Sequence, residues 1–323
     1  MPAQQRTGKS WFTGSADAIY QSLNLIRDDE PDYVVVFGAD NIYRMDVDAM
    51  LQSHISSGAE CTIAGIRVPR SEASAFGIID ADSDGKMNRF LEKPADPPGL
   101  PDSPDESFAS MGNYIFNAKS FVECLTRDAV DPTSKHDMGG DVVPYYVNKG
   151  TAWVYDFTKN DVPGSTDKDR NYWRDVGTID AYWDANIDLT ATDPLLNLYD
   201  TNWPIWTYQP QLPPAKFVHN QDDRRGVAVE SLVSGGCIIS GAVFRSVLFS
   251  SVRVHSYSAV SWSVLLPGVQ VGRHARLTRV VVDRDCVVPD GMVIGEDAAA
   301  DAEHFYRTES GITLVTREML RRL

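Results

Sequence analysis

The fold of the carboxyl-terminal part is decided by residues 243–282, VFRSVLFSSVRVHSYSAVSWSVLLPGVQVGRHARLTRVVV. Aliphatic residues recur there every five or six positions, and the repeat extends to both sides: Leu232, Ile238, Val243, Leu248, Val254, Val260, Leu265, Val271, Leu277, Val282, Val288 and Ile294. Small or apolar residues follow four positions later, for example Ala242, Val252, Ser258, Val264, Val269 and Ala275. Strands this short cannot bury a face alone, so each coil must stack on the next. The repeat predicts a β-helix over residues 205–323. A β-sandwich would alternate with period two and turn every 8–12 residues.

Residues 10–190 instead alternate between helical and strand patterns, which is typical of a layered α/β domain, expected over residues 1–204. The segment 33–37, YVVVF, is apolar throughout, as a strand covered on both faces of a parallel sheet should be. The other expected elements are helices at 16–26, 47–57 and 119–126 and strands at 61–68 and 111–116. The proline-rich passage 94–105 must be a loop, and a second one at 203–214 marks the domain boundary.

The composition excludes several classes of protein. A net charge of −15 repels phosphate backbones and argues against nucleic-acid binding, and an acidic protein that handles phosphorylated molecules would need a cation such as Mg²⁺. No apolar run is long enough for a transmembrane helix. The four cysteines form no C-x-x-C pair, which argues against a zinc site and a disulfide framework and favours a cytoplasmic location.

Positive charge is concentrated in the β-helix segment. Residues 224–284 hold eight Arg, no Lys and two acids, which is +6, so the rest of the chain carries −21. Arginine favours bidentate recognition of phosphate. Alternatively, these arginines pair with the acidic domain at an interface, and the count alone leaves both interpretations open.

Three side chains are candidates for chemistry on phosphates. Asp40 follows a buried strand, at the position where open α/β sheets bind ligands, and Asp175 is a second carboxylate that could complete a metal site. Lys93 lies before the proline-rich loop, where a cation suits a sugar phosphate. Each has a simpler interpretation as a turn, cap or surface residue. His136 could also be catalytic, but a structural loop histidine is the favoured interpretation.

The order of the motifs is more specific than any one of them. Gly14-Ser15-Ala16-Asp17-Ala18, Gly38-Ala39-Asp40, Ala75-Phe76-Gly77, Glu92-Lys93-Pro94, Ser110-Met111-Gly112-Asn113-Tyr114, Tyr172-Trp173-Arg174-Asp175-Val176-Gly177-Thr178, Ser231-Leu232-Val233-Ser234-Gly235-Gly236 and Thr316-Arg317-Glu318-Met319-Leu320 follow one another. This series, from Pro2 to Leu323, closely resembles the bacterial glucose-1-phosphate adenylyltransferase (ADP-glucose pyrophosphorylase) family. The resemblance implies a Rossmann-like nucleotidyltransferase domain followed by a left-handed parallel β-helix.

The resemblance also implies an activity: glucose 1-phosphate and ATP give ADP-glucose and pyrophosphate, with Mg²⁺, for glycogen biosynthesis. By motif, Asp40 and Asp175 are the catalytic metal-binding pair. The glucose 1-phosphate residues are Phe12, Gly77, Glu92, Lys93 and Ser110, and Gly14, Ser15, Ala16 and Asp17 lie near the nucleotide. Allosteric positions for fructose 1,6-bisphosphate and AMP match Arg284, Arg317, Glu318, Met319, Leu320 and Arg321. A homotetramer is implied, and these matches favour phosphate binding by the basic β-helix.

Three departures from the family pattern matter. Asn41 stands where the family usually has His, and Phe12 stands where a Tyr hydroxyl usually reaches the sugar phosphate. The family's opening segment, with its Gly-rich triphosphate loop, is missing, and no G-G-x-G-x-R-L occurs in this sequence. We therefore expect this chain alone to be inactive. The alternatives are a non-catalytic subunit that binds effectors or oligomerises, and a β-helix acyltransferase that uses an acyl-CoA.

Overall fold

The computed structural model describes residues 11–221 and 223–323. Its contacts divide the chain into two compact units. The first unit ends at Ala39 and resumes over Tyr43–Trp173, and the second contains Asp40–Ile42 and Arg174–Leu323. The segment before the β-helix thus groups with the β-helix from residue 174 onward. The domain boundary expected at residue 204 stays a prediction.

The first unit is built around a mixed sheet with the strand order β5-β4-β6-β3-β7, and β1 also pairs with β6. Only β3 and β7 run parallel; the other neighbours are antiparallel. The strands are β1 (Tyr33–Phe37), β3 (Cys61–Pro69), β4 (Gly77–Ala81), β5 (Met87–Glu92), β6 (Glu106–Asn117) and β7 (Ala152–Asp156).

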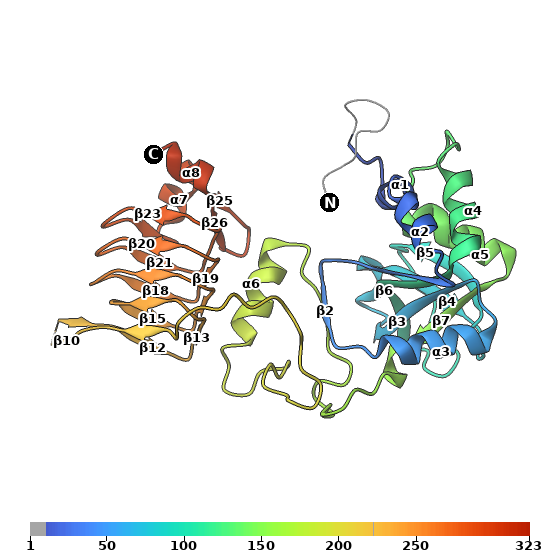
Figure 1. The fold of residues 1–323 in the computed structure, drawn as a ribbon, viewed down its shortest axis with the longest axis horizontal. Coiled ribbons are helices and arrows are strands. Elements are labelled where there is room, and N and C mark those ends of the chain that lie inside the picture. The colour runs from blue at the N-terminus through green and yellow to red at the C-terminus, as the bar shows by residue number, and fades with distance from the viewer. Residues whose placement is uncertain (1–10, 222) are drawn as a thin grey trace. The chain divides into compact units, whose positions relative to one another are not determined.

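Helices cover both faces of this sheet, as Figure 1 shows. One face carries α1 (Ser15–Tyr20), α2 (Leu23–Asp29), α4 (Ala118–Asp128) and α5 (Val143–Lys149), packed over a core that includes Phe116, Phe121 and Tyr146. The other face carries α3 (Val47–Ser57), which buries Met50 against Met111 and Ile115. The layered α/β organisation expected from the sequence is confirmed.

Two local expectations were wrong. The strand at 33–37 forms as expected, but in the described part of the chain it pairs only with β6, in antiparallel orientation, and the side chains of Val35 and Phe37 are 42% and 37% exposed. An apolar run does not by itself distinguish a strand covered on both faces from one that lies at an edge. The helix expected over 16–26 is interrupted at Gln21–Ser22, so two short helices form.

Short elements complete the first unit and its border. β2 (Asn41–Tyr43) pairs with β8 (Trp173–Asp175), so the residues around 40 and 175 lie side by side. The remaining elements are η1 (Ala73–Ala75), the π-helical turn η2 (Met138–Val142) and η3 (Phe157–Lys159).

The proline-rich passage 94–105 is a loop, as expected. Arg67 holds it to the sheet through Asp102 and Asp156, at 2.9 and 2.8 Å.

The second unit is a parallel β-helix with three sheets, which confirms the interpretation of the repeat. Val243 pairs with Val260 and Val260 with Leu277, a step of 17 residues per coil. One sheet contains β12 (Val227–Val229), β15 (Ala242–Phe244), β18 (Ala259–Ser261), β21 (Arg276–Thr278) and β24 (Val293–Ile294). The second contains β13 (Leu232–Val233), β16 (Val247–Leu248), β19 (Val264–Leu265), β22 (Val280–Val282), β26 (Thr313–Val315) and β25 (Tyr306–Arg307). The third contains β9 (Lys216–Phe217), β14 (Ile238–Ile239), β17 (Arg253–Val254), β20 (Gln270–Val271) and β23 (Val287–Val288), and β10 (Asn220–Gln221) and β11 (Arg224–Arg225) form a hairpin.

The repeat positions from Val243 to Ile294 point into the β-helix core, but the repeat position Ile238 does not. Its side chain is 37% exposed, whereas Ile239 is fully buried opposite Val254. Ala242, one of the small residues that follow the repeat positions, is also exposed. Because side chains alternate between the two faces of a strand, a shift of one residue reverses the direction of each.

Helices α6 (Ile179–Asp188), α7 (Ala298–His304) and α8 (Arg317–Arg321) pack on the β-helix unit. Helix α6 lies against β19 and shares a small apolar cluster of Trp183, Ile187, Val264, Val281 and Ile312 with the coils. Over the described residues, none of the helices has the length and apolarity needed to span a membrane.

Candidate functional site

The structure brings Asp40 and Asp175 together around Gly177. A methyl group built on Gly177 would lie 3.1 Å from Asp175 Oδ1 and 3.4 Å from Asp40 Oδ2. The backbone fixes this arrangement, since Val176 N–H donates to the Asp40 carbonyl at 2.7 Å and Gly177 N–H donates to Asp175 Oδ1 at 2.8 Å. Both carboxylates are exposed and belong to the second unit.

The donor set around Gly177 suits one kind of ion. Among residues 11–221 and 223–323, no cluster of three or more His, Cys, Asp or Glu side chains could enclose a metal by itself. Mg²⁺ does not require such a cage, because it commonly binds through one or two carboxylates together with waters and substrate phosphates. Two exposed carboxylates whose oxygens border the same space beside Gly177 therefore fit Mg²⁺ in this role.

A second group of predicted residues meets in the first unit, where the start of β4 and the end of β5 lie beside the middle of β6. A methyl group on Gly77 would lie 3.3 Å from Glu92 Oε2 and 2.8 Å from the ring of Phe90. Lys93, directly after β5, has a left-handed backbone with φ 45°, and its N–H donates to the Phe76 carbonyl. The Lys93 ammonium is largely exposed and forms only a long ion pair with Glu92, at 3.9 Å, so it can also contact a ligand.

Ser110 belongs to this group because the antiparallel register of β4 and β6 places it beside Gly77. Tyr114 lies four residues further along β6. Burial raises the pKa of Tyr114 to about 12, the hydrogen bond with Ser110 opposes this, and the carboxylates of Asp137 and Glu92 raise the pKa further. The Tyr114 hydroxyl therefore stays protonated at neutral pH and keeps its proton to donate.

Asp137 is a member of this group that the sequence reasoning missed. It precedes η2, where its side chain accepts from Gly140 N–H at 2.8 Å and from the Ser15 hydroxyl at 2.9 Å. No local signal in the segment Lys135–Asp141 distinguishes Asp137, because only the fold brings it close to Ser15 and Tyr114. His136, in the same segment, binds Asp128 at 2.8 Å, in agreement with its structural interpretation.

The predicted nucleotide segment, Gly14–Asp17, packs directly on the same loop. A methyl group on Gly14 would lie 2.2 Å from the carbonyl oxygen of His136, so only glycine fits there. Ala16 N–H donates to that carbonyl at 2.8 Å, and Met138 N–H donates to the Ser15 hydroxyl at 2.9 Å. The Asp17 carboxylate accepts hydrogen bonds from Thr13 N–H and from the Gln21 side chain. It therefore binds groups within its own segment rather than pointing outward.

Two aromatic side chains near these motifs differ in how they are placed. Phe12 contacts Trp11 edge to face at 5.8 Å, and within the described contacts nothing joins it to the other predicted sugar residues. Trp173, two residues before Asp175, packs against Phe76, and its buried indole N–H has no hydrogen-bond partner in the structure. Buried donors are normally satisfied, so this N–H is an exception among the described residues.

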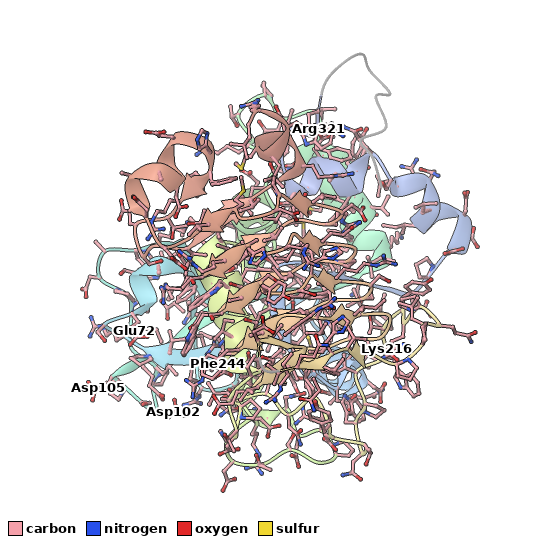
Figure 2. All side chains as sticks on the ribbon, turned by 90° about the vertical axis from the view of Figure 1, so that its left-hand side faces the viewer. Glu72, Asp102, Asp105, Lys216, Phe244 and Arg321 are labelled. Atoms are coloured by element: carbon pink, nitrogen blue, oxygen red, sulfur yellow. The ribbon has the colours of Figure 1, made fainter. Side chains whose placement is uncertain are left out.

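The predicted effector residues divide into two kinds. Met319 and Leu320 of α8 pack on the β-helix core, whereas Arg284, Arg317, Glu318 and Arg321 are exposed. Helix α8, which begins at Arg317, lies against β23, directly after residues 284–286. Burial and the charge of Asp283 raise the pKa of the Cys286 thiol to about 11, and the charge of Arg317 opposes this. Figure 2 shows Arg321 at one end of the β-helix, away from Lys216 and Phe244.

Partners of the other β-helix arginines lie within the same unit. Arg245 pairs with Glu230, Arg276 pairs with Glu296 at 2.8 Å, and the guanidinium of Arg279 lies 4.7 Å from the ring centre of Trp183. Among the described residues, Arg225, Arg253 and Arg284 have no carboxylate within ion-pair distance. A part of the basic surface is thus already neutralised and a part is available.

Comparison with known proteins matches both units. A family model described as nucleotidyl transferase matches residues 1–192, and one described as GlmU-like, C-terminal hexapeptide, matches residues 213–315. Among curated proteins, a glucose-1-phosphate adenylyltransferase from Cutibacterium acnes is 58% identical over 98% of this chain and 76% of its own length. Proteins of the same name from Parafrankia sp. and Corynebacterium jeikeium are 55% and 51% identical, over 98% and 99% of this chain and 77% and 78% of their own lengths.

Proposed function

The chain belongs to the nucleotidyltransferase family of glucose-1-phosphate adenylyltransferases, and on that premise we propose that its site joins the adenylyl group of ATP to glucose 1-phosphate. A phosphate oxygen of glucose 1-phosphate attacks the α-phosphorus of ATP. One phosphorus–oxygen bond forms, the bond to the β-phosphate breaks, and pyrophosphate leaves with that electron pair. Such a transfer depends on positioning and on neutralising charge.

The observation that carries this proposal is the pair of carboxylates held around Gly177. Asp40 and Asp175 would hold Mg²⁺, which neutralises charge on the reacting phosphates when it is bound. The backbone hydrogen bonds of Val176 and Gly177 keep the two carboxylates in place. The aspartates themselves transfer no proton.

In the first unit, we assign binding of glucose 1-phosphate to Glu92, Lys93, Ser110 and Gly77. Carboxylate and hydroxyl groups suit sugar hydroxyls, and the exposed Lys93 ammonium suits the phosphate. Gly77 leaves room beside Glu92, since a side chain there would meet its carboxylate and Phe90. Tyr114 and Asp137 complete this group, and Gly14–Asp17 lies on the loop of Asp137, near the nucleotide. Phe12 remains a predicted contact of the sugar phosphate.

Further parts of the assignment stay predictions: fructose 1,6-bisphosphate or AMP at Arg284, Arg317 and Arg321, a role in glycogen synthesis, assembly as a homotetramer, and a cytoplasmic location. The packing of Met319 and Leu320 supports the effector assignment, because it fixes α8 and leaves its arginines exposed. Release of pyrophosphate from ATP and glucose 1-phosphate with Mg²⁺ measures whether the 323-residue chain catalyses this reaction alone.

Binding of glucose 1-phosphate tests the sugar site without requiring turnover. Replacing Lys93 by Gln removes a charged contact with phosphate and should weaken binding by about tenfold or more, measured by isothermal titration of the 323-residue chain. Lys119→Gln is the matched control, because Lys119 is also exposed and belongs to none of the site motifs. Equal affinity of the Lys93 variant and the parental chain would refute the assignment of Lys93.

A further inference from the structure

We propose that Asp180 is a positioning residue for the metal pair, acting through a clamp between helix α6 and the carboxyl-terminal loop Thr308–Ser310. This inference rests on the proposed role of Asp40 and Asp175. It assigns to the β-helix unit a part in metal binding, because that unit would hold in place the helix that follows Asp175.

The clamp consists of two hydroxyl groups on one carboxylate. Thr308 Oγ1 donates to Asp180 Oδ1 at 2.7 Å, and the Ser310 hydroxyl donates to the same oxygen. More than 120 residues separate Asp180 from this loop. Thr308 also accepts from Ile312 N–H at 3.0 Å, so the loop is closed on itself and offers a fixed surface to α6.

Other contacts keep the same helix on the β-helix. The indole N–H of Trp183 donates to the Trp262 carbonyl at 2.7 Å, and Arg279 lies over the Trp183 ring. Arg279 Nη2 also donates to the Ser310 carbonyl at 3.2 Å, so one arginine connects the Trp183 contact with the clamp loop. Trp183 fixes the middle of α6, and Asp180 fixes its first turn.

The first turn of α6 is joined to the metal pair by a short, hydrogen-bonded chain segment. Thr178 caps the helix, accepting from Ala181 N–H at 3.2 Å, and Gly177 N–H donates to Asp175. Only four residues separate Asp175 from Asp180, so movement of the first turn changes the position of Asp175 relative to Asp40. Residues that hydrogen-bond a metal ligand directly change metal affinity by about 10–100-fold when replaced. Asp180 acts through the backbone between Asp175 and α6, so we expect an effect at the lower end of that range.

The clamp loop, Thr308–Ser310, is connected through the chain to helix α8. The clamp loop leads directly into β26 and then into α8, where Arg317 and Arg321 are exposed. Both ends of this path, the metal pair and α8, belong to the second unit. The clamp is therefore the place at which the carboxyl-terminal segment contacts the helix that carries the metal-binding motif.

The test measures Mn²⁺ binding to the 323-residue chain by electron paramagnetic resonance of the free ion, which requires no turnover. Asp180→Asn keeps the size of the side chain, weakens both hydroxyl contacts, and should lower Mn²⁺ affinity by about tenfold. Asp180→Glu, which restores the carboxylate, should bind nearly as the parental chain does. Glu309→Gln is the matched control, because Glu309 lies in the same loop but is exposed and outside the clamp.

The double change Thr308→Val with Ser310→Ala reaches the clamp from its other side and keeps the inference testable if an Asp180 variant folds poorly. This double change should lower Mn²⁺ affinity by the same factor. Adding Asp180→Asn to it should lower the affinity no further, because the three side chains belong to one set of hydrogen bonds. Unchanged Mn²⁺ affinity in these variants, with or without a lower melting temperature, would overturn the inference. Asp175→Asn should abolish binding; if it does not, the proposed metal pair itself is wrong and the inference falls with it.

Discussion

Replacing Gly14 by Ala should release the amino-terminal helix segment from the loop that carries Asp137. Gly14 has an extended backbone with φ −171°, which alanine adopts without strain. The added methyl group, however, would lie 2.2 and 2.5 Å from the carbonyl oxygens of His136 and Lys135, and neither backbone oxygen can move as a flexible side chain would. The segment must therefore shift away from the loop.

The size of the effect follows from the contacts that the shift breaks. These are Ala16 N–H to the His136 carbonyl, the Ser15 hydroxyl to Asp137, and Met138 N–H to the Ser15 hydroxyl, at 2.8, 2.9 and 2.9 Å. At about 1 kcal/mol net for each hydrogen bond, the loss is about 3 kcal/mol. That is a change of about a hundredfold in the equilibrium for local opening.

Hydrogen exchange followed by mass spectrometry measures this opening directly, in a peptide that covers residues 14–20. Protection should fall by about a hundredfold in Gly14→Ala. Gly140→Ala is the control, because a methyl group there comes no closer than 3.5 Å to the side chains around it, and the protection of residues 14–20 should be unchanged in that variant. Mn²⁺ affinity should also be unchanged, since Asp40 and Asp175 belong to the other unit. Parental protection in Gly14→Ala would refute this reasoning.

Two further predictions concern buried polar groups of the first unit. Arg44→Met should lower the unfolding free energy by about 3–5 kcal/mol, because it leaves the buried carboxylate of Asp169 without its arginine; a melting temperature that stays within a degree of the parental value would contradict this. Burial lowers the pKa of His54 below its ordinary 6.5, so the unfolded chain binds more protons and stability should fall as the pH drops through and below about 6.5. His54→Gln should flatten that fall in urea unfolding followed between pH 7.5 and 5, whereas an equally steep pH dependence would assign the effect to other groups.

Local patterns in the sequence determined several elements closely. Helix α3 forms over the expected residues, Val47–Ser57, because Asp46 caps its start by accepting from Asp48 and Ala49 N–H and Gly58 ends it in the left-handed conformation. The β-helix was predictable for the same reason. Its repeat is local, and each coil requires the same inward-facing residues as the coil before it.

The order of the motifs also pointed to the nucleotidyltransferase family, which the comparisons confirm. The sequence could not indicate Asp137, because its relevance depends on contacts with Ser15 and Tyr114, which are far from it in the chain. Nor did the repeat distinguish Ile238 from Ile239, since both are aliphatic and only the pairing with β17 decides which one points inward.

Only the tertiary structure decided which segments meet. The strand at 33–37 was predictable from its composition. Its antiparallel pairing with β6, however, depends on the path of roughly eighty intervening residues, and no local pattern encodes that path. In the same way, Asp40 and Asp175 are both visible as candidate carboxylates, yet their meeting around Gly177 requires the pairing of β2 with β8. Helix α6 joins the β-helix because Trp183 and Asp180 find partners there, at positions that the sequence alone does not connect.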